Sequence, residues 1–497
     1  KDGSPFIHIP VGFIRTLNSK TYNWHFETEP EDNTNGRVIP VARGKVLGGS
    51  SSINGMVYVR GQARDYDGWA QMGNRGWSWD DVLPYFVKSE NREGATDETP
   101  WRGRGGLLNV SDVTETYPLL DRLIDAAVEC GYSRTQDYNS GDQEGFSYYQ
   151  VTQKNGRRWS TATAFLDPAR SRPNLTIEIN AFTTQILLEG TRAVGVVFDQ
   201  KGAQRRVRAH REVILSAGAV QSPQILEASG IGQPKLLSDH GIEVRHALPG
   251  VGENYRDHYL IRMVWRVKNA RTLNEQTRGL AFLGEVAKWA FTRKGVLSLP
   301  GGILSGFVRS RPDLEGPDLQ MRATHASFKD VRKRILDDFP GITLAPNQLR
   351  PESRGSIHIK SANPKNLPSI RTNFLSDEID RQALVAAMKI SRNLIAAPAM
   401  APYIVQELAP TAGAVSDDEL LDVARRDGAT VFHPVGTCKM GQDTMAVVDD
   451  RLRVHGLSGL RVIDASIMPV LISGNTNAPT IMIAEKGAAM ILEDAIA

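Results

Sequence analysis

The sequence predicts an α/β fold with a parallel sheet covered on both faces, and three observations lead to this class. Two short runs of apolar and β-branched residues, 212–216 and 460–464, are typical of buried strands in such a sheet. Two other segments, 380–397 and 479–496, have helical character. The length of 497 residues exceeds the usual size of one domain, so we expect two interleaved domains.

Each predicted element has a local cause. The run 212–216 is followed by Ala217-Gly218, which ends the strand in a turn. The runs 175–179 and 193–198 also combine apolar and β-branched residues, so we expect two further strands there.

The two helices are predicted from apolar stripes and end signals. In 380–397 the stripe includes Leu384, Met388 and Ile395, and Pro398 ends the helix. The segment 479–496 begins with a Pro, which favours a helix start, and Asn residues lie just before it.

Composition and charge exclude several classes of function. The hydrophobic fraction of 41% and the charged fraction of 23% are ordinary for a soluble protein. A net charge of +3 without a long basic run argues against a nucleic-acid partner. The sequence contains no run of 18 apolar residues, so it predicts no transmembrane segment. Cys130 and Cys438 are too few for a disulfide framework, and we expect no metal site.

Two glycine-rich segments have the chemistry of ligand-binding turns. In 43–61, Gly48 and Gly49 let the backbone approach a flat or anionic ligand, and the serines and amide groups that follow can bind phosphate oxygens. Taken alone, this run is more typical of a loop or linker. The segment 216–232 is predicted to form a strand end, a tight glycine turn and a helix.

The C-terminal part contains a candidate catalytic pair. His433 precedes Pro434, which favours an extended backbone, and Asn475 lies just before the last helix. An imidazole can take the proton of a hydroxyl, and an amide can hold the resulting alkoxide. The alternatives are structural: Asn475 or Asn477 can cap the helix, and His258 is more typical of a hydrogen-bonded structural histidine.

These segments resemble the signatures of the glucose–methanol–choline (GMC) family of flavin-dependent alcohol oxidoreductases. The string 43–61 resembles the first signature, 216–232 the second, and His433 and Asn475 stand where the family has its catalytic pair. The resemblance covers essentially the whole chain and is strongest to the bacterial choline and alkanol dehydrogenase branch. It implies an FAD-binding domain interleaved with an α+β substrate domain on a mainly antiparallel sheet. The implied division is 1–115, 158–258 and 428–497 for FAD, and 116–157 and 259–427 for substrate.

The resemblance also implies a reaction, the oxidation of a primary alcohol to an aldehyde by hydride transfer to FAD. His433, with an ordinary pKa, would be the general base, and Asn475 would donate to the alkoxide. The start of the last helix would turn its positive dipole end toward the flavin. The implied FAD-binding residues are Val46, Gly48, Gly49, Ser50, Asn54, Gly55, Met56, Val57, Thr183, Asp464, Ala465, Thr476 and Asn477.

The sequence departs from the family pattern at three places. No strand–Gly-x-Gly-x-x-Gly–helix unit opens it, which predicts weakened FAD binding. Ile53 stands where covalently flavinylated members often have a His, so we expect non-covalent FAD. Ile303 stands where several choline- or alkanol-oxidising relatives have an acidic residue.

Other functions stay open from the sequence. The chain could be an oxidase that uses oxygen, a hydroxynitrile lyase that keeps FAD without redox chemistry, or an inactive fragment. The expected partners are a small alcohol and an electron acceptor, which is a quinone, a redox protein or oxygen. The expected location is cytoplasmic or peripheral to the inner membrane.

Overall fold

The largest sheet has nine strands in the part of the chain that the structure, a computed structural model, describes: residues 2–331 and 335–496. Every pairing in this sheet is antiparallel, as predicted for the substrate part. Its strands are β5 (Gly145–Tyr148), β15 (Tyr259–Leu260), β16 (Met263–Val267), β17 (Leu304–Val308), β18 (Leu319–Thr324), β21 (Gly341–Leu344), β22 (Asn347–Gln348), β25 (Ile404–Leu408) and β26 (Ala429–Thr430).

Three helices form the first apolar core together with this sheet. They are α5 (Pro118–Glu129), α11 (Glu378–Ala396) and α12 (Asp417–Asp427). The predicted stripe of α11 is confirmed, because Leu384, Met388 and Ile395 are all buried in this core. The carboxylate of Asp377 caps α11 by accepting from the backbone N–H of Ile379.

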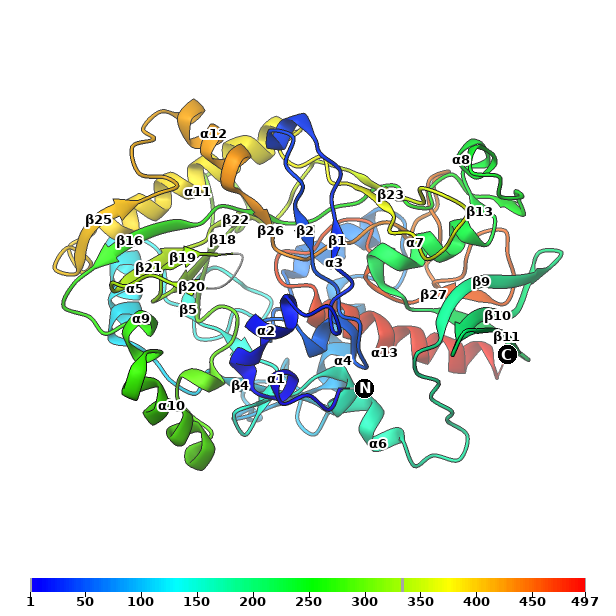
Figure 1. Cartoon of the computed structure of the whole chain (residues 1–497), viewed down its shortest axis with the longest axis horizontal. Helices are drawn as coiled ribbons and strands as arrows, with labels where there is room; N and C mark the ends of the chain where they lie inside the picture. Colours follow the sequence, from blue (N-terminus) through cyan, green and yellow to red (C-terminus); the bar gives the residue numbers. More distant parts are fainter. Residues whose placement is uncertain (1, 332–334, 497) are drawn as a thin grey trace.

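A second core surrounds the C-terminal helix α13 (Asn477–Asp494), coloured red in Figure 1. It includes α3 (Ala63–Gln71), α4 (Trp79–Ser89) and the parallel pair β12 (Val213–Leu215) and β27 (Leu460–Val462). This pair confirms both predicted strands and their parallel arrangement, and β27 is buried as predicted. The predicted burial of β12 is wrong, because only Leu215 is buried and Ile214 is 39% exposed. Helix α7 (Gly218–Ala228) follows β12 after the predicted glycine turn.

One predicted strand is wrong. The segment 175–179 is irregular and largely exposed, and in the described part of the chain it pairs with no strand. Pairing and burial, more than residue propensity, decide whether such a run becomes a strand. The run 193–198 is confirmed inside β10 (Arg192–Gln200), which pairs with β9 (Phe182–Glu189) and β11 (Ala203–Arg208).

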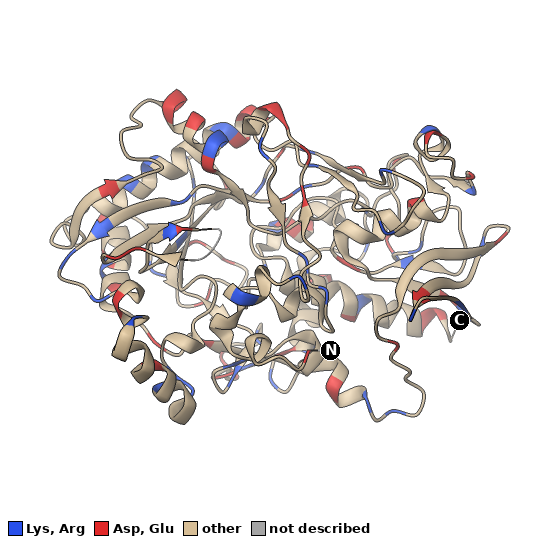
Figure 2. Cartoon of the chain, in the orientation of Figure 1, with Lys and Arg blue, Asp and Glu red and all other residues tan. Residues whose placement is uncertain are grey.

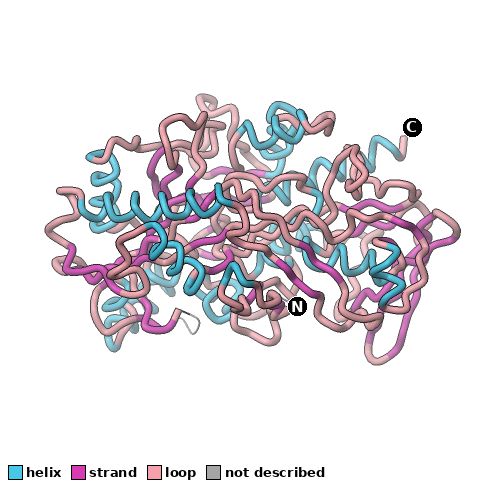
Figure 3. The backbone as a smooth tube through the Cα atoms, turned by 90° about the horizontal axis from the view of Figure 1, so that it is seen from above, coloured by secondary structure: helices cyan, strands magenta, loops and turns pink. Residues whose placement is uncertain are grey.

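The remaining elements are short except for α10, and loops connect them through much of the molecule (Figure 3). The other helices are α1 (Pro5–His8), α2 (Phe13–Leu17), α6 (Asp167–Ala169), α8 (Pro234–Asp239), α9 (Leu273–Gln276) and α10 (Gly279–Thr292). The other strands are β1 (Phe26–Glu27), β2 (Pro40–Val41), β3 (Glu90–Arg92), β4 (Leu108–Asp112), β6 (Gln150–Val151), β7 (Gln153–Lys154), β8 (Arg157–Arg158), β13 (Ile231–Gly232), β14 (His246–Ala247), β19 (Phe328–Asp330), β20 (Ile335–Leu336), β23 (Ser356–His358) and β24 (Ser369–Arg371).

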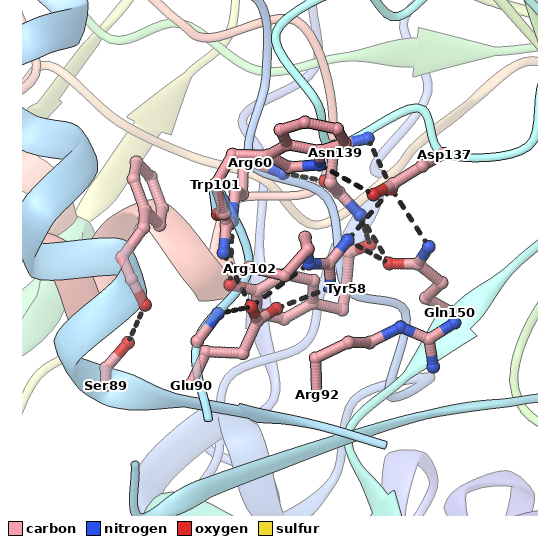
Figure 4. A network of polar contacts seen from close by, with 12 residues as sticks. Tyr58, Arg60, Ser89, Glu90, Arg92, Trp101, Arg102, Asp137, Asn139 and Gln150 are labelled. Atoms are coloured by element: carbon pink, nitrogen blue, oxygen red, sulfur yellow. Dashed lines mark hydrogen bonds and ion pairs between the residues drawn. The ribbon is translucent and has the colours of Figure 1, made fainter. Parts of the chain in front are cut away.

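A buried network of ion pairs holds the end of the first glycine-rich segment (Figure 4). The carboxylate of Glu90 accepts from Arg60 Nη2 at 2.7 Å, from Arg102 Nη2 at 2.5 Å and from the backbone N–H of Gly103 at 2.8 Å. The side chains of Arg60 and Glu90 are both 0% exposed. Because Arg102 also pairs with Asp137, the network ties three separate stretches of chain together.

Candidate active site

A cavity of about 1860 Å³ is lined by residues of both apolar cores. Its walls include the glycine-rich segment, the start of α13 and residues of the antiparallel sheet. Typical small-molecule pockets measure roughly 300–1,000 Å³. The cavity therefore has room for a large cofactor together with a small substrate.

His433 is held at this cavity by its backbone and by a buried carboxylate. Its backbone N–H donates to Asp257 Oδ1 at 2.8 Å, and Asp257 also accepts from the hydroxyls of Tyr255 and Thr430. The preceding residue, Phe432, has a φ of 65°, and its carbonyl accepts from the guanidinium of Arg43. These contacts fix the direction in which the imidazole enters the cavity.

The His433 ring makes one contact at each nitrogen. Its Nδ1 lies 2.9 Å from Nδ1 of His258, and its Nε2 lies 3.1 Å from Nδ2 of Asn475. Burial, together with repulsion from His258 and the nearby guanidinium groups of Arg322 and Arg43, lowers the pKa of His433 well below its ordinary value. This direction differs from the ordinary pKa expected from the sequence, and it favours the neutral ring.

The start of α13 opens on the cavity. Thr476 and Asn477 line it, and the N-cap residue Thr476 makes no side-chain capping bond. Free N–H groups at a helix start carry partial positive charge and bind anionic or oxygen-rich groups. Since the N-cap is Thr476, Asn475 does not have the capping role that was the alternative for it.

The glycine turns leave open backbone beside the same cavity. Gly49 and Gly218 both line it with φ values of 55° and 84°, and a Cβ at either would meet no heavy atom within 4 Å. Added side chains would fill the space that a flat or anionic ligand needs. The exposed turns, the helix start and the cavity size together fit a flavin dinucleotide.

The structure brings most of the predicted site residues together. Of the described residues, those that line the cavity include His433, Asn475, Gly48, Gly49, Ser50, Asn54, Gly55, Met56, Val57, Asp464, Ala465, Thr476 and Asn477. Val46 and Thr183 are not among them, and Thr183 lies on β9. Contact with FAD stays a prediction for all of these residues.

Two of these polar residues also shape the site. The carboxylate of Asp464 accepts from the N–H of Gly218 at 2.8 Å and from the hydroxyl of Ser222 at 2.5 Å, which holds the turn before α7. Asn54 Oδ1 accepts from Arg158 Nη1 at 2.8 Å. Both side chains therefore position backbone at the cavity, whatever else they contact.

Sequence reasoning missed two polar residues of β18. Gln320 is buried, and its Nε2 lies 3.4 Å from Asn475 Oδ1. Arg322 lines the cavity and donates to Gln320 Oε1 at 2.8 Å. A signal was present: apolar and polar residues alternate along 319–324, which places Gln320 and Arg322 on one face.

Comparison with known proteins identifies the family of the chain. Two family models described as GMC oxidoreductase match residues 16–260 and 351–484. An alcohol dehydrogenase [acceptor] of Pseudomonas putida is 43% identical over 99% of this chain and 89% of its own length. An oxygen-dependent choline dehydrogenase of Chromohalobacter salexigens is 44% identical over 96% of this chain and 86% of its own.

Solved structures share the fold of the chain. Pyridoxine 4-oxidase from Mesorbium loti has a TM-score of 0.88 and 29% identity, covering 99% of this chain and 92% of its own. An Aspergillus oryzae formate oxidase variant, studied for FAD modification, has a TM-score of 0.91 and 26% identity over 99% of this chain and 92% of its own. The chain belongs to the GMC oxidoreductase family and is an FAD-dependent oxidoreductase of alcohols.

Proposed function

We propose that the protein oxidises a primary alcohol to an aldehyde, with His433 as general base. The observation that carries the proposal is the contact between His433 Nε2 and the Asn475 amide, 3.1 Å apart on the wall of the cavity. The proposal assigns FAD binding to 1–115, 158–258 and 428–497, and substrate binding to 116–157 and 259–427.

The two side chains have complementary roles. A hydroxyl that replaces their direct contact can donate to His433 Nε2 while its oxygen accepts from Asn475 Nδ2. His433 then takes the proton, and Asn475 stabilises the charge that develops on oxygen. Bound FAD would supply the acceptor for the hydride that leaves the carbinol carbon.

An anaerobic spectral titration tests this function against its rivals. Protein loaded with FAD is mixed with an alcohol without oxygen, and we expect the flavin absorbance to be lost. Rapid recovery in air would identify an oxidase, whereas slow recovery would leave a quinone or a redox protein as the acceptor. Unchanged absorbance with FAD bound would favour a lyase, and failure to bind added FAD would favour the inactive fragment.

We propose that FAD is held without a covalent bond. Ile53 is buried in the first signature and lines the cavity, and its side chain has no nucleophile or ring nitrogen. Acid precipitation of the loaded protein should therefore release flavin into the supernatant. Flavin that stays with the washed pellet would contradict this prediction.

We propose that uncharged primary alcohols are better substrates than choline. Ile303 lines the cavity and is buried, and the nearby Arg322 is a cation. An unpaired ammonium group carries a desolvation cost of several kcal/mol in apolar surroundings, and Arg322 would repel it further. A kinetic panel of choline, hexanol and benzyl alcohol should show lower kcat/KM for choline, and Ile303→Glu should narrow the gap. A clear preference for choline would contradict the prediction.

We propose that the protein is cytoplasmic or peripheral to the inner membrane, and that α10 makes the membrane contact. This helix projects from the body and is mostly uncharged (Figures 1 and 2). It has no buried residue, and Leu280, Leu283 and Phe291 are 85%, 62% and 89% exposed. Exposed apolar helices with basic neighbours, here Arg293 and Lys294, favour the interface of a bilayer. No helix in residues 2–331 and 335–496 is long and apolar enough to cross one.

Sedimentation with anionic phospholipid vesicles measures this contact. We expect the wild type to sediment with the vesicles and the double variant Leu280→Ser, Phe291→Ser to stay in solution. Leu492→Ser removes an exposed leucine of α13, away from α10, and should not change sedimentation. Equal sedimentation of all three proteins would contradict the assignment to α10.

A further inference from the structure

We propose that His258, Gln320 and Arg322 are positioning residues that hold His433 in the one neutral form that can act as a base. The inference rests on the role of His433 proposed above and concerns where its proton lies. The three residues act through a directional chain of hydrogen bonds that runs from Arg322 through Gln320, Asn475, His433 and His258 to the carbonyl of Leu349.

One end of the chain is an obligate acceptor. The carbonyl oxygen of Leu349 lies 2.9 Å from His258 Nε2, so this nitrogen must carry a proton and donate it. Burial lowers the pKa of His258 to about 3, which leaves the ring neutral with that single N–H. Its Nδ1 can then only accept. The 2.9 Å contact between the two Nδ1 atoms therefore requires a proton on His433 Nδ1.

The other end is an obligate donor. The guanidinium of Arg322 can only donate, so the Gln320 oxygen that lies 2.8 Å from its Nη2 must be the acceptor. The amide nitrogen of Gln320 then faces Asn475 Oδ1 at 3.4 Å and donates to it. Asn475 is thereby turned so that its Nδ2, a donor, faces His433 Nε2 at 3.1 Å. This contact requires a lone pair on Nε2.

The argument from the Leu349 carbonyl and the argument from the Arg322 guanidinium require the same tautomer of His433, although they reach its ring through different residues. The neutral ring has its proton on Nδ1 and its lone pair on Nε2, the nitrogen that meets the substrate hydroxyl. A proton on Nε2 would set two donors, Nε2–H and Nδ2–H, against each other in a buried place. The chain thus excludes both the wrong tautomer and the protonated ring before substrate arrives.

The isosteric change Gln320→Glu reverses the direction of the hydrogen bonds from Gln320 to Asn475 and from Asn475 to His433. A carboxylate of the same shape still accepts from Arg322 but has no hydrogen for Asn475. Asn475 is then expected to turn its Nδ2 toward the carboxylate and its Oδ1 toward His433, which favours a proton on Nε2. We expect kcat to fall by about 10-fold or more and the acid limb of the pH–rate profile to move to higher pH, with FAD content unchanged.

Long-range ¹⁵N NMR of histidine-labelled protein, assigned with His433→Ala, measures the tautomer itself. We expect a protonated Nδ1 on His433 in the wild type and a shift toward protonated Nε2 in Gln320→Glu. Arg322→Lys, which keeps a donor, should retain more of the wild-type signal than Arg322→Met. His325→Leu is the matched control, because this buried ring makes no hydrogen bond to any described residue and should leave the His433 signal unchanged.

The outcomes separate this inference from the proposed function. A protonated Nε2 on neutral wild-type His433 would overturn the inference, whatever the activity. An unchanged tautomer in both Gln320→Glu and Arg322→Met would overturn it as well. If the tautomer shifts as expected in Gln320→Glu while kcat stays the same, the hydrogen-bond chain is supported and the role of His433 as base is refuted.

Discussion

Turnover of the His433→Ala variant is expected to fall by about 10²-fold to 10⁴-fold, the usual contribution of a positioned general base. Alanine leaves the hydroxyl proton without an acceptor, since the neutral imidazole is the group that faces Asn475 at the cavity wall. The measurement is kcat with saturating alcohol, alongside FAD content from the visible spectrum. FAD content should not change. Turnover near that of the wild type would remove His433 from the mechanism.

The Asn475→Ala variant provides the companion measurement. If the amide stabilises charge that forms only during the reaction, kcat and kcat/KM should fall together. A change confined to KM would instead assign Asn475 to substrate binding. Helix α13 should stay folded, because its N-cap is Thr476 and not Asn475.

Replacing Glu90 with glutamine is expected to lower the free energy of unfolding by about 3–5 kcal/mol. This carboxylate is the shared partner of Arg60 and Arg102. The change leaves the buried guanidinium of Arg60 without this counter-charge, and Arg102 keeps its pair with Asp137. Arg60 belongs to the first signature, so loosening it should also disturb the backbone that borders the cavity. Denaturant unfolding of the wild type and the variant measures the difference.

A surface ion pair serves as the control for this change. Arg104 and Asp97 pair through side chains that are 56% and 91% exposed. Exposed pairs contribute roughly 0–1 kcal/mol, so Asp97→Asn should change the unfolding free energy little. Equal losses in Glu90→Gln and Asp97→Asn would show that burial of the network does not determine its contribution.

The parts of the fold that local sequence controls could be predicted. The runs at 212–216 and 460–464 became the parallel strands β12 and β27, and the stripe at 380–397 became α11. The segment 175–179 failed because a strand needs a neighbour, which no local pattern supplies. The predicted last helix was right, but it begins at Asn477, two residues before the Pro that indicated its start.

The part of the site that local sequence controls could also be predicted. His433 and Asn475 each had a local context, and the structure places them in contact. The other groups of the hydrogen-bond chain lie far away in sequence. His258, which contacts His433, comes from the segment before the antiparallel sheet. Gln320 and Arg322, which are linked to His433 through Asn475, come from the sheet itself. Only the folded chain brings these groups together. The lowered pKa of His433 follows from burial, which its neighbours in sequence do not determine.

Anaerobic single-turnover reduction is the most direct test of alcohol oxidation at this site. Protein saturated with added FAD is mixed with hexanol or with hexanol deuterated at the carbinol carbon, and flavin absorbance is followed in time. We expect absorbance to be lost with both alcohols, and more slowly with the deuterated one, because the C–H bond breaks as the hydride leaves. Flavin that stays bound and oxidised with every alcohol of the panel would contradict it.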